Sequence, residues 1–202
     1  PDGRAVIDDV GLTVRAGEVV GIAGVEGNGQ TELIEAITGM IRPTAGTIQF
    51  KDRDITHAPV RKRRELGMSH IPEDRLKMGS AKTCSIRDNL ILNRYYQKPF
   101  STLHFMDNRR LRQFANDLCE RFLVKTPDAS FKLSTLSGGN MQKVVFAREM
   151  DADPDLLAEL ATRGELRRYR KGTVLIYWGR RGALARWCLD LAPLIQRSTH
   201  RN

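Results

Sequence analysis

The clearest pattern near the start of the chain is a short apolar run, followed by glycines and then by a segment of helical composition. Residues 19–23 are continuously apolar, as expected of a buried strand. Residues 30–38 combine good helix formers with apolar residues, and Gly39 supplies a stop signal. Residues 17–39 are therefore predicted to form a strand that leads into a helix through a glycine loop.

Two weaker strand signals flank this unit. Residues 5–14 alternate weakly between apolar and polar positions, like an edge strand. Residues 46–50, followed by 51–55, are typical of a strand and a turn. Together they predict a small sheet layer beside the glycine loop.

The pattern becomes helical between residues 84 and 125. An apolar stripe with spacings of three and four indicates an amphipathic helix, and we interpret it as a packing face rather than a binding face. Its members are Leu111, Phe114, Ala115, Leu118, Cys119 and Phe122. A second glycine-bearing loop, 136–140, then introduces a helix that runs through Met150 and ends before Pro154.

Composition places the 202-residue chain among ordinary globular proteins, with 41% hydrophobic and 28% charged residues. No apolar stretch approaches the roughly 18 residues that span a bilayer, so a membrane role would depend on a partner. The three cysteines, Cys84, Cys119 and Cys188, match neither a disulfide framework nor a zinc site, which favours a reducing cytoplasm.

The net charge of +9 is concentrated at one end of the chain. Residues 160–202 contain ten Lys or Arg against two acidic residues, whereas residues 1–159 are nearly neutral. A basic segment can bind nucleic acid nonspecifically through phosphate contacts, but aromatic interleaving and groove-fitting motifs are absent from the sequence. We therefore expect no specific nucleic-acid partner.

The glycine loop has the spacing of a phosphate-binding loop, G-x-x-x-x-G-K-[ST]. Its glycines let successive backbone N–H groups turn toward phosphate oxygens, and the helix that follows adds the positive end of its dipole. The last residue of the motif stands where a hydroxyl would hold Mg²⁺. The candidate nucleotide-binding residues are Gly24, Gly27, Asn28, Gly29, Gln30 and Thr31, and Thr31 is also the candidate metal ligand.

One position departs from this motif, because Gln30 occupies the place of the lysine. The lysine normally puts a positive charge on the β and γ phosphates. Neutral glutamine still donates hydrogen bonds, and losing one charged contact costs about 1.5–3 kcal/mol. We expect nucleotide binding to persist and fast hydrolysis to be lost. A plain tight turn between strand and helix is the alternative interpretation of this loop.

The second loop and its helix, residues 134–149, resemble the signature sequence of ABC-transporter ATPases, the LSGGQ element. Physically, this is another helix N-terminus preceded by small residues, able to present a hydroxyl and backbone amides to a phosphate. The resemblance implies that the loop contacts the γ-phosphate bound by an opposite ATPase domain, so that a functional site is composite. Its candidate residues are Ser137, Gly138, Gly139 and Asn140.

Two further segments resemble the same family. Residues 67–75 are similar to the strand leading into the Q-loop, with Glu73 where a glutamine usually reaches Mg²⁺ and the attacking water. Residues 85–90 resemble the start of the helical subdomain that couples to the membrane subunits. An ordinary surface loop and an ordinary helix start are the alternatives.

These features together resemble the second ATPase half of two-domain proteins that energise monosaccharide and nucleoside uptake in bacteria. The resemblance covers about residues 3–157. It implies an α/β fold: an incomplete P-loop NTPase (RecA-like) core with an antiparallel β subdomain and an inserted helical subdomain. We therefore divide the chain into a partial ATPase domain, 1–157, with its helical subdomain at about 84–150, and a basic tail, 158–202.

The match fails after residue 157, where the family continues as an apolar strand that carries the catalytic acid. No such strand follows here. Glu159 is a weak candidate general base, Glu73 is another weak catalytic candidate, and His200 is a poorer candidate for the family's switch histidine. We hypothesise that the chain is truncated or that its reading frame changes near residue 158, so that the tail would be accidental sequence. The parallel sheet is then expected to lack central strands.

The resemblance implies ATP and Mg²⁺ as cofactors. It implies a first-half ATPase domain and transmembrane permease subunits as partners, with a solute-binding protein as an indirect one, at the cytoplasmic face of the bacterial inner membrane. The leading hypothesis is an ATP-binding subunit, or a fragment of one, that energises import of a sugar or nucleoside. The alternatives are a non-hydrolysing module that completes a partner's ATPase site and, third, another P-loop protein such as a small-molecule kinase. The chain alone is expected to be inactive as an ATPase.

Overall fold

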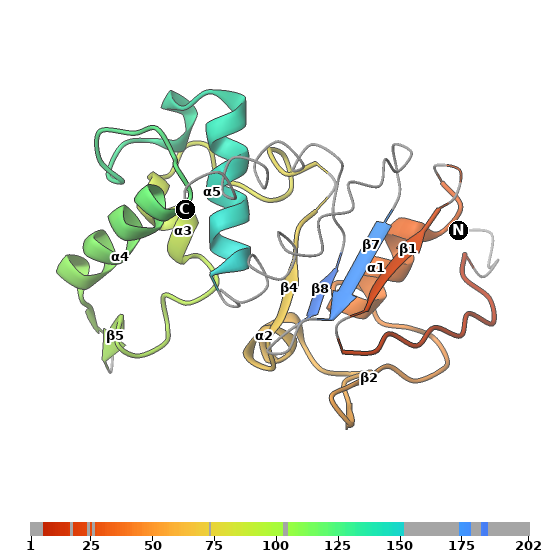
Figure 1. Ribbon diagram of the computed structural model, residues 1–202. Coiled ribbons are helices and arrows are strands. Elements are labelled where there is room, and N and C mark those ends of the chain that lie inside the picture. Colours follow the sequence, from red (N-terminus) through yellow and green to blue (C-terminus); the bar gives the residue numbers. More distant parts are fainter. Residues whose placement is uncertain are drawn as a thin grey trace. The chain divides into compact units, whose positions relative to one another are not determined.

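The computed structural model describes residues 6–16, 18–23, 25, 27–72, 74–102, 105–151, 174–178 and 183–185. These residues belong to two compact units, and each is described by itself. The first unit comprises residues 1–70 and 153–202, and the second comprises residues 71–152. In Figure 1 the first unit runs from red through orange to the yellow-orange of β4, with β7 and β8 in blue, and the second unit runs from yellow through green to cyan.

The first unit contains a four-stranded sheet in the order β1, β7, β8, β4. Its strands are β1 (Val19–Ile22), β4 (Met68–His70), β7 (Val174–Trp178) and β8 (Ala183–Ala185). β7 pairs antiparallel with both β1 and β8, whereas β8 and β4 run parallel. The blue β7 lies beside the red β1 in Figure 1. The sheet is therefore mixed, and not parallel as the sequence analysis expects.

The two central positions of this sheet are filled by strands that the sequence analysis does not expect. β7 reads Val-Leu-Ile-Tyr-Trp, a continuous run of β-branched, apolar and aromatic residues that is typical of a central strand. Val20 pairs with Ile176, and Leu184 pairs with Tyr177 on one side and Ser69 on the other. The expectation that the sheet lacks central strands is wrong for these two segments. The change of reading frame near residue 158 stays a prediction.

The helix after the glycine loop, α1 (Gln30–Thr38), begins and ends at the predicted residues. Gly39 ends it in the left-handed conformation, with φ of 85°. β2 (Gln49–Phe50) and β3 (Arg53–Asp54) form an antiparallel hairpin. Its turn residues, Lys51 and Asp52, both have positive φ, as a type I′ turn requires. The hairpin lies within the predicted strand and turn at 46–55.

Residues 6–14 do not form the predicted edge strand. A strand needs a neighbour for its backbone groups, and among the described residues no strand pairs with this segment. Val14 packs instead against the buried Ile34 of α1, and the carbonyl oxygen of Val6 lies close to Gly29. Contacts with α1 and the loop before it therefore place this segment.

A buried arginine joins the end of α1 to α2 (Val60–Glu65). Arg63 is 2% exposed, and its guanidinium donates to four backbone carbonyls. Two of them, Ala36 (2.7 Å) and Ile37 (2.6 Å), belong to the last turn of α1, where a helix leaves carbonyls unsatisfied. The others belong to Thr56 (3.0 Å) and Ala58 (2.8 Å). Burial lowers the pKa of Arg63, but the acceptors and the negative end of the α1 dipole favour the charged form.

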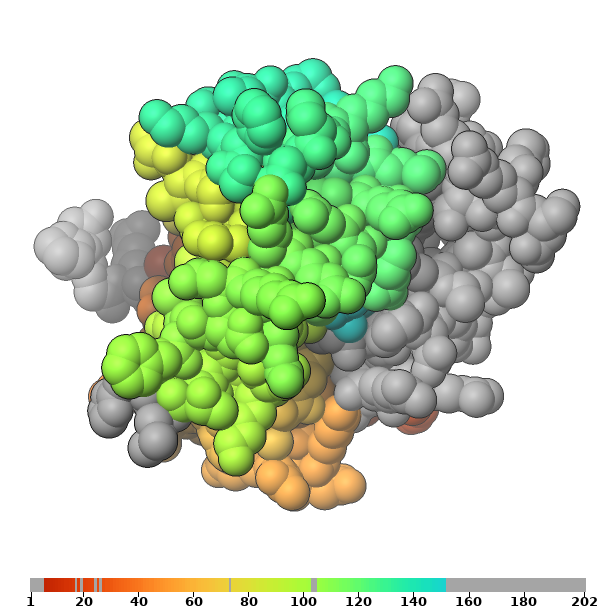
Figure 2. Space-filling model, turned by 90° about the vertical axis from the view of Figure 1, so that its left-hand side faces the viewer, coloured from red at the N-terminus to blue at the C-terminus, as the bar shows by residue number. Residues whose placement is uncertain are grey.

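In the second unit the described residues form α3 (Ile86–Ile91), α4 (Asn108–Arg121) and α5 (Gly138–Met150). The 3₁₀ turn η1 (Leu133–Thr135) precedes α5, and a short hairpin of β5 (Ser101–Thr102) and β6 (Phe105–Met106) precedes α4. Figure 2 looks onto the green surface to which this hairpin and α4 contribute. None of the helices in the described ranges combines the length and apolarity needed to span a bilayer.

The predicted apolar stripe of α4 packs into the core of the second unit. Leu111, Ala115, Leu118 and Cys119 are buried, and Phe114 and Phe122 pack against the same cluster. The cluster also takes in, from the other two helices, Ile86, Leu90, Val144 and Ala147. The interpretation of the stripe as a packing face is confirmed.

The two cysteines of the second unit are expected to differ in reactivity. Cys84 is exposed, whereas Cys119 is buried. Burial, and after it the negative charge of Asp128, raise the pKa of the Cys119 thiol to about 11, so little thiolate forms at neutral pH. Iodoacetamide should label Cys84 readily in the native protein and Cys119 only in urea, as measured by peptide mass spectrometry. Equal native labelling of both would contradict the packing of α4.

Candidate nucleotide-binding site

The glycine loop is built around two residues in the left-handed conformation. Gly27 has φ of 90° and Gly29 has φ of 88°. Between them, Asn28 donates its backbone N–H to the carbonyl of Val25 (3.2 Å). Glycine adopts such φ values without the steric cost that a Cβ brings. The predicted loop between β1 and α1 is therefore a tight turn whose backbone only glycine accommodates well at these two positions.

Gly29 is also required by its surroundings. It is buried, and a Cβ built on it would lie 3.0 Å from the carbonyl oxygen of Val6 and 3.4 Å from Cγ1 of Ile7. Gly27 has a similar φ, but it is exposed, and within the part of the chain that the structure describes nothing lies within 4 Å of its Cβ position. The last glycine of the loop thus serves a close backbone approach, whereas Gly27 leaves open space beside the loop.

The N-terminus of α1 offers backbone donors to this open space. Gly29 is the N-cap, and a glycine has no side chain with which to cap the helix. Leu33 donates to the carbonyl of Gly29 (2.9 Å), so the regular helical bonds start there, after the backbone N–H groups of Thr31 and Glu32. With the positive end of the helix dipole, these groups fit an anionic ligand such as a phosphate.

Gln30 and Thr31 open the helix. Gln30 is half-buried and Thr31 is exposed. The amide of Gln30 donates hydrogen bonds but brings no positive charge, so backbone amides and the helix dipole would carry the attraction for an anion. The hydroxyl of Thr31 fits one oxygen ligand of Mg²⁺, an ion that keeps several waters in such sites. The other candidates of this site, Gly24, Glu73 and Glu159, lie outside the described residues.

The second loop is a helix N-terminus, as predicted. Ser137 is the N-cap of α5 in an extended conformation, and its side chain makes no capping hydrogen bond to the described first turn of the helix. Ser137, Gly138 and Gly139 are exposed, and a Cβ on either glycine would meet no atom of the described residues within 4 Å. Neither glycine has a positive φ, and glycine costs a helix roughly 0.5–1 kcal/mol relative to alanine. The two glycines thus weaken α5 without packing against any of the described residues, which fits the close approach of an external phosphate.

The segment that precedes Ser137, residues 131–133, pairs through backbone hydrogen bonds with the segment around the start of α3, residues 84–86. Ile86 donates its backbone N–H to the carbonyl of Phe131 (2.8 Å), and Leu133 donates to the carbonyl of Cys84 (2.9 Å). Ser85 lies between these contacts and caps α3. The start of the helical segment and the lead-in to the second loop therefore hold each other in place.

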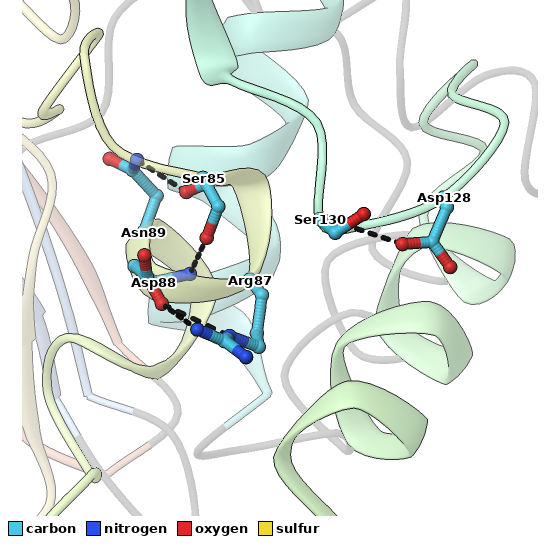
Figure 3. A network of polar contacts seen from close by, with 6 residues as sticks. All are labelled: Ser85, Arg87, Asp88, Asn89, Asp128 and Ser130. Carbon is cyan, nitrogen blue, oxygen red and sulfur yellow. Dashed lines mark hydrogen bonds and ion pairs between the residues drawn. The ribbon is translucent and has the colours of Figure 1, made fainter. Parts of the chain in front are cut away.

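The polar side chains at the start of α3 serve this helix. Oγ of Ser85 accepts the backbone N–H of Asp88 (3.0 Å), whose carboxylate accepts from Arg87 (2.9 Å), as Figure 3 shows. The buried Asn89 donates to the carbonyls of Ala81 and Ser85, both at 2.9 Å. Burial raises the pKa of Asp88, but hydrogen bonds from Ser85 and Arg87 outweigh it and hold the pKa below its ordinary value. The predicted helix start at 85–90 is confirmed. The polar side chains of this segment cap the helix and fix its first turn.

A second carboxylate in Figure 3 fixes the turn that leads to the second loop. Asp128 accepts the backbone N–H of Ser130 (2.8 Å) and a guanidinium N–H of Arg112 (2.9 Å). These bonds, those from Ser130 first, hold the pKa of Asp128 well below its ordinary value. The carboxylate therefore stays ionised at neutral pH and keeps the turn closed.

Charged residues that the sequence analysis misses fix the end of α5. Nε of the buried Arg148 donates to Oε1 of Glu149 (2.9 Å). Asp151, just after the helix, accepts from Arg94 (2.5 Å) and Arg121 (2.7 Å). A charged pair inside the otherwise apolar run 144–150 is the sequence signal that points to a buried network there.

Comparison with known families explains why these two loops occur in one chain. Residues 7–158 match the ABC transporter family, and the match spans the phosphate loop and the second loop with α5. The chain belongs to this family, whose ATPases bind ATP, typically with Mg²⁺. The resemblance stated from the sequence is confirmed.

Its relatives are import proteins. The chain is similar to the guanosine import ATP-binding protein NupO of Bacillus subtilis, at 44% identity over 80% of this chain and 32% of that protein. It is also similar to the glucose import ATP-binding protein TsgD13 of Haloferax volcanii, at 43% identity over 80% of this chain and 30% of that protein. The chain thus spans about a third of the length of these relatives.

The fold has a solved counterpart. The dimeric structure of the ATP-binding cassette MJ0796 in a post-hydrolysis state, bound to ADP and Pi, matches with a TM-score of 0.57 at 18% identity. The match covers 79% of this chain and 75% of that chain. The predicted class, an incomplete α/β P-loop NTPase fold, is confirmed.

Proposed function

We propose that this chain is an ATP-binding module of an ABC importer and that it energises uptake of a nucleoside or a sugar. One observation carries the proposal: a phosphate loop and an exposed Ser-Gly-Gly helix start, whose described N-cap residues make no side-chain capping bond, occur in one chain of this family. The names of two relatives specify import of guanosine and of glucose, and they support these two classes of solute.

The first part of the proposal is that the chain's own loop binds MgATP. The backbone of Gly24, Gly27, Asn28 and Gly29 would wrap the phosphates, and Gln30 would donate to the β and γ oxygens. Thr31 would hold Mg²⁺. Because no cation stands at position 30, this loop stabilises bound phosphate more than the charge that develops during transfer.

The second part is that α5 acts on a different nucleotide. Ser137, with Gly138, Gly139 and Asn140, would present a hydroxyl and backbone amides to the γ-phosphate of ATP held by a first-half ATPase domain. Closure of the two domains over ATP would then drive transmembrane permease subunits, which receive the solute from a solute-binding protein. This places the module peripherally at the cytoplasmic face of the inner membrane.

A second candidate function is a non-hydrolysing module that binds nucleotide only to complete the partner's site. The neutral side chain of Gln30 favours it, because the missing charge matters most in the transition state of phosphoryl transfer. In this variant of the proposal the chain contributes binding and closure, and the partner's site performs the chemistry.

ATP turnover tests both functions. The purified chain alone is expected to show no turnover above background, whereas adding a first-half ATPase domain should produce turnover that Ser137→Ala in this chain reduces. Turnover by the chain alone would refute the non-hydrolysing module. A partner whose turnover does not depend on this chain would refute the importer module as a whole.

Restoring the lysine of the loop is expected to tighten nucleotide binding. Gln30→Lys adds a charged hydrogen bond to phosphate, a gain of about 1.5–3 kcal/mol that lowers the Kd for MgATP by roughly 10–150-fold. Gln30→Met, which keeps the length and removes the donor, should weaken binding. Isothermal titration calorimetry measures all three proteins. Equal Kd values would contradict the position of residue 30 at the phosphates.

A further inference from the structure

We propose that Asn140 is a positioning residue, whose side-chain amide fixes the hydroxyl of Ser137 as a hydrogen-bond donor toward the phosphate of the partner's ATP. The inference rests on the proposed function. It adds a role for the residue that closes the Ser-Gly-Gly-Asn run, a residue whose polar atoms are engaged inside the chain.

The orientation of the Asn140 amide follows from its neighbours. The backbone N–H of Lys125 donates to Oδ1 of Asn140 at 3.2 Å. A backbone N–H can only donate, so the amide oxygen faces Lys125 and the amide nitrogen faces the other way. There, Nδ2 donates to Oγ of Ser137 at 3.2 Å. The usual ambiguity between the oxygen and nitrogen of an asparagine amide is thereby removed.

This orientation decides what the Ser137 hydroxyl can do. A hydroxyl has one proton and two acceptor lone pairs, and Asn140 occupies one of the lone pairs. The proton cannot point at the amide, because an N–H already points back along that line. Ser137 is exposed, and the space at the Cβ positions of Gly138 and Gly139 is open. The hydroxyl is therefore set as a donor at the N-terminus of α5, the role that an anionic oxygen requires.

The main-chain donor that anchors the amide is itself held against α5. Leu123, directly after the C-cap of α4, is in the left-handed conformation with φ of 53°, and Val124 donates back to the carbonyl of Cys119 (2.8 Å). Nζ of Lys143 donates to the carbonyl of Leu123 (2.7 Å). The segment 123–125 thus contacts α5 at residue 140 and again at residue 143. The backbone N–H that Asn140 accepts therefore belongs to a segment that is fixed against the helix.

Asn140→Asp is the isosteric test of this role. A carboxylate accepts from the Lys125 N–H as the amide does, but its second oxygen is also an acceptor. The Ser137 hydroxyl therefore donates to this oxygen and no longer donates to the phosphate. We expect ATP-dependent association with the first-half ATPase domain to weaken about 10-fold or more. Gln142→Glu adds the same charge on the same helix by an equally isosteric change. As the control, it should weaken association less than about threefold.

The experiment titrates the full chain against a fluorescently labelled first-half ATPase domain with Mg²⁺ and the non-hydrolysable analogue AMP-PNP, for the wild type, Ser137→Ala, Asn140→Asp and the double variant. If Asn140 acts through Ser137, Asn140→Asp should cause little further loss of association once Ser137 is alanine. This further loss should be no larger than the loss that Gln142→Glu causes in the wild type. Fully additive losses would overturn the positioning role, and so would an Asn140→Asp chain that associates like the wild type. MgATP binding to the chain's own loop should be unchanged in all four.

Two outcomes separate this inference from the proposed function. A wild-type chain that shows no association dependent on AMP-PNP would overturn the proposed function and the role of Asn140 with it. A readout without partner or nucleotide checks the geometry alone: the Lys125 amide signal in a ¹H–¹⁵N NMR spectrum should shift in Asn140→Ala. An unshifted Lys125 signal would overturn the orientation of the amide even where the proposed function holds.

Discussion

Replacing Arg63 by methionine is expected to lower the free energy of unfolding of the first unit by about 3–5 kcal/mol. Methionine keeps much of the aliphatic bulk but removes all the donors that Arg63 directs at four backbone carbonyls. A buried carbonyl that loses its donor costs about 1–3 kcal/mol. Because Ala36 and Ile37 belong to the end of α1, the helix that follows the phosphate loop should fray from its C-terminus.

Urea unfolding measures this loss through the fluorescence of Trp178 in β7, with Trp187→Phe present in every variant. The matched control is Arg61→Met on the same helix, where the guanidinium makes an exposed ion pair with Glu65 at 3.4 Å. Such a pair contributes about 0.5 kcal/mol or less. An Arg63→Met chain as stable as Arg61→Met would contradict the buried contacts of Arg63 with α1.

Gly29→Ala is expected to damage both the fold and nucleotide binding. An alanine at φ of 88° costs about 1–2 kcal/mol, and its Cβ would lie 3.0 Å from the carbonyl oxygen of Val6, which is backbone and must shift. We expect a total loss of roughly 2–3 kcal/mol in stability. Because Gly29 is the N-cap of α1, the same shift would turn the first N–H groups of α1 away from the phosphates, and the Kd for MgATP should rise about 10-fold or more.

Gly46→Ala separates the two effects. Gly46 has φ of 84°, almost that of Gly29, but it stands outside the loop and no atom of the described ranges lies within 4 Å of its Cβ position. This variant should lose only the conformational cost, about 1–2 kcal/mol, and bind MgATP like the wild type. Calorimetric titration and urea unfolding check both variants. Unchanged MgATP affinity in Gly29→Ala would contradict the loop as the nucleotide site.

Several helices of this structure could be predicted from patterns of nearby residues. The bounds of α1 follow from the glycine loop and Gly39, and the packing face of α4 follows from the spacing of its apolar residues. The starts of α3 and α5 lie where the sequence analysis expects them, directly after Ser85 and Ser137, and Ser85 caps its helix. In each case the signal lies within a few residues of the feature that it predicts, because helix periodicity and capping are local properties.

The features that were missed depend on contacts between distant segments. Arg63 stands in the basic run 61–64, which looks like a solvated face, and only the carbonyls of residues 36, 37, 56 and 58 place it inside. The amide of Asn140 is oriented by Lys125, fifteen positions earlier. β7 has the β-branched and aromatic composition of a strand, although basic residues surround it, whereas β8 reads Ala-Leu-Ala and carries no strand signal of its own. Sequence periodicity alone does not report such pairings.

Thermal melting of the purified chain, with and without MgATP at about 100 times its Kd, tests most directly whether the loop of this chain is a nucleotide site. Ligand at that excess adds roughly 2.7 kcal/mol of stability, which corresponds to a rise in Tm of about 5–10 °C for a chain of this size. We predict a cooperative transition that moves upward by this amount and moves further in Gln30→Lys. A cooperative transition that MgATP leaves in place, in the wild type and in Gln30→Lys alike, would contradict the account.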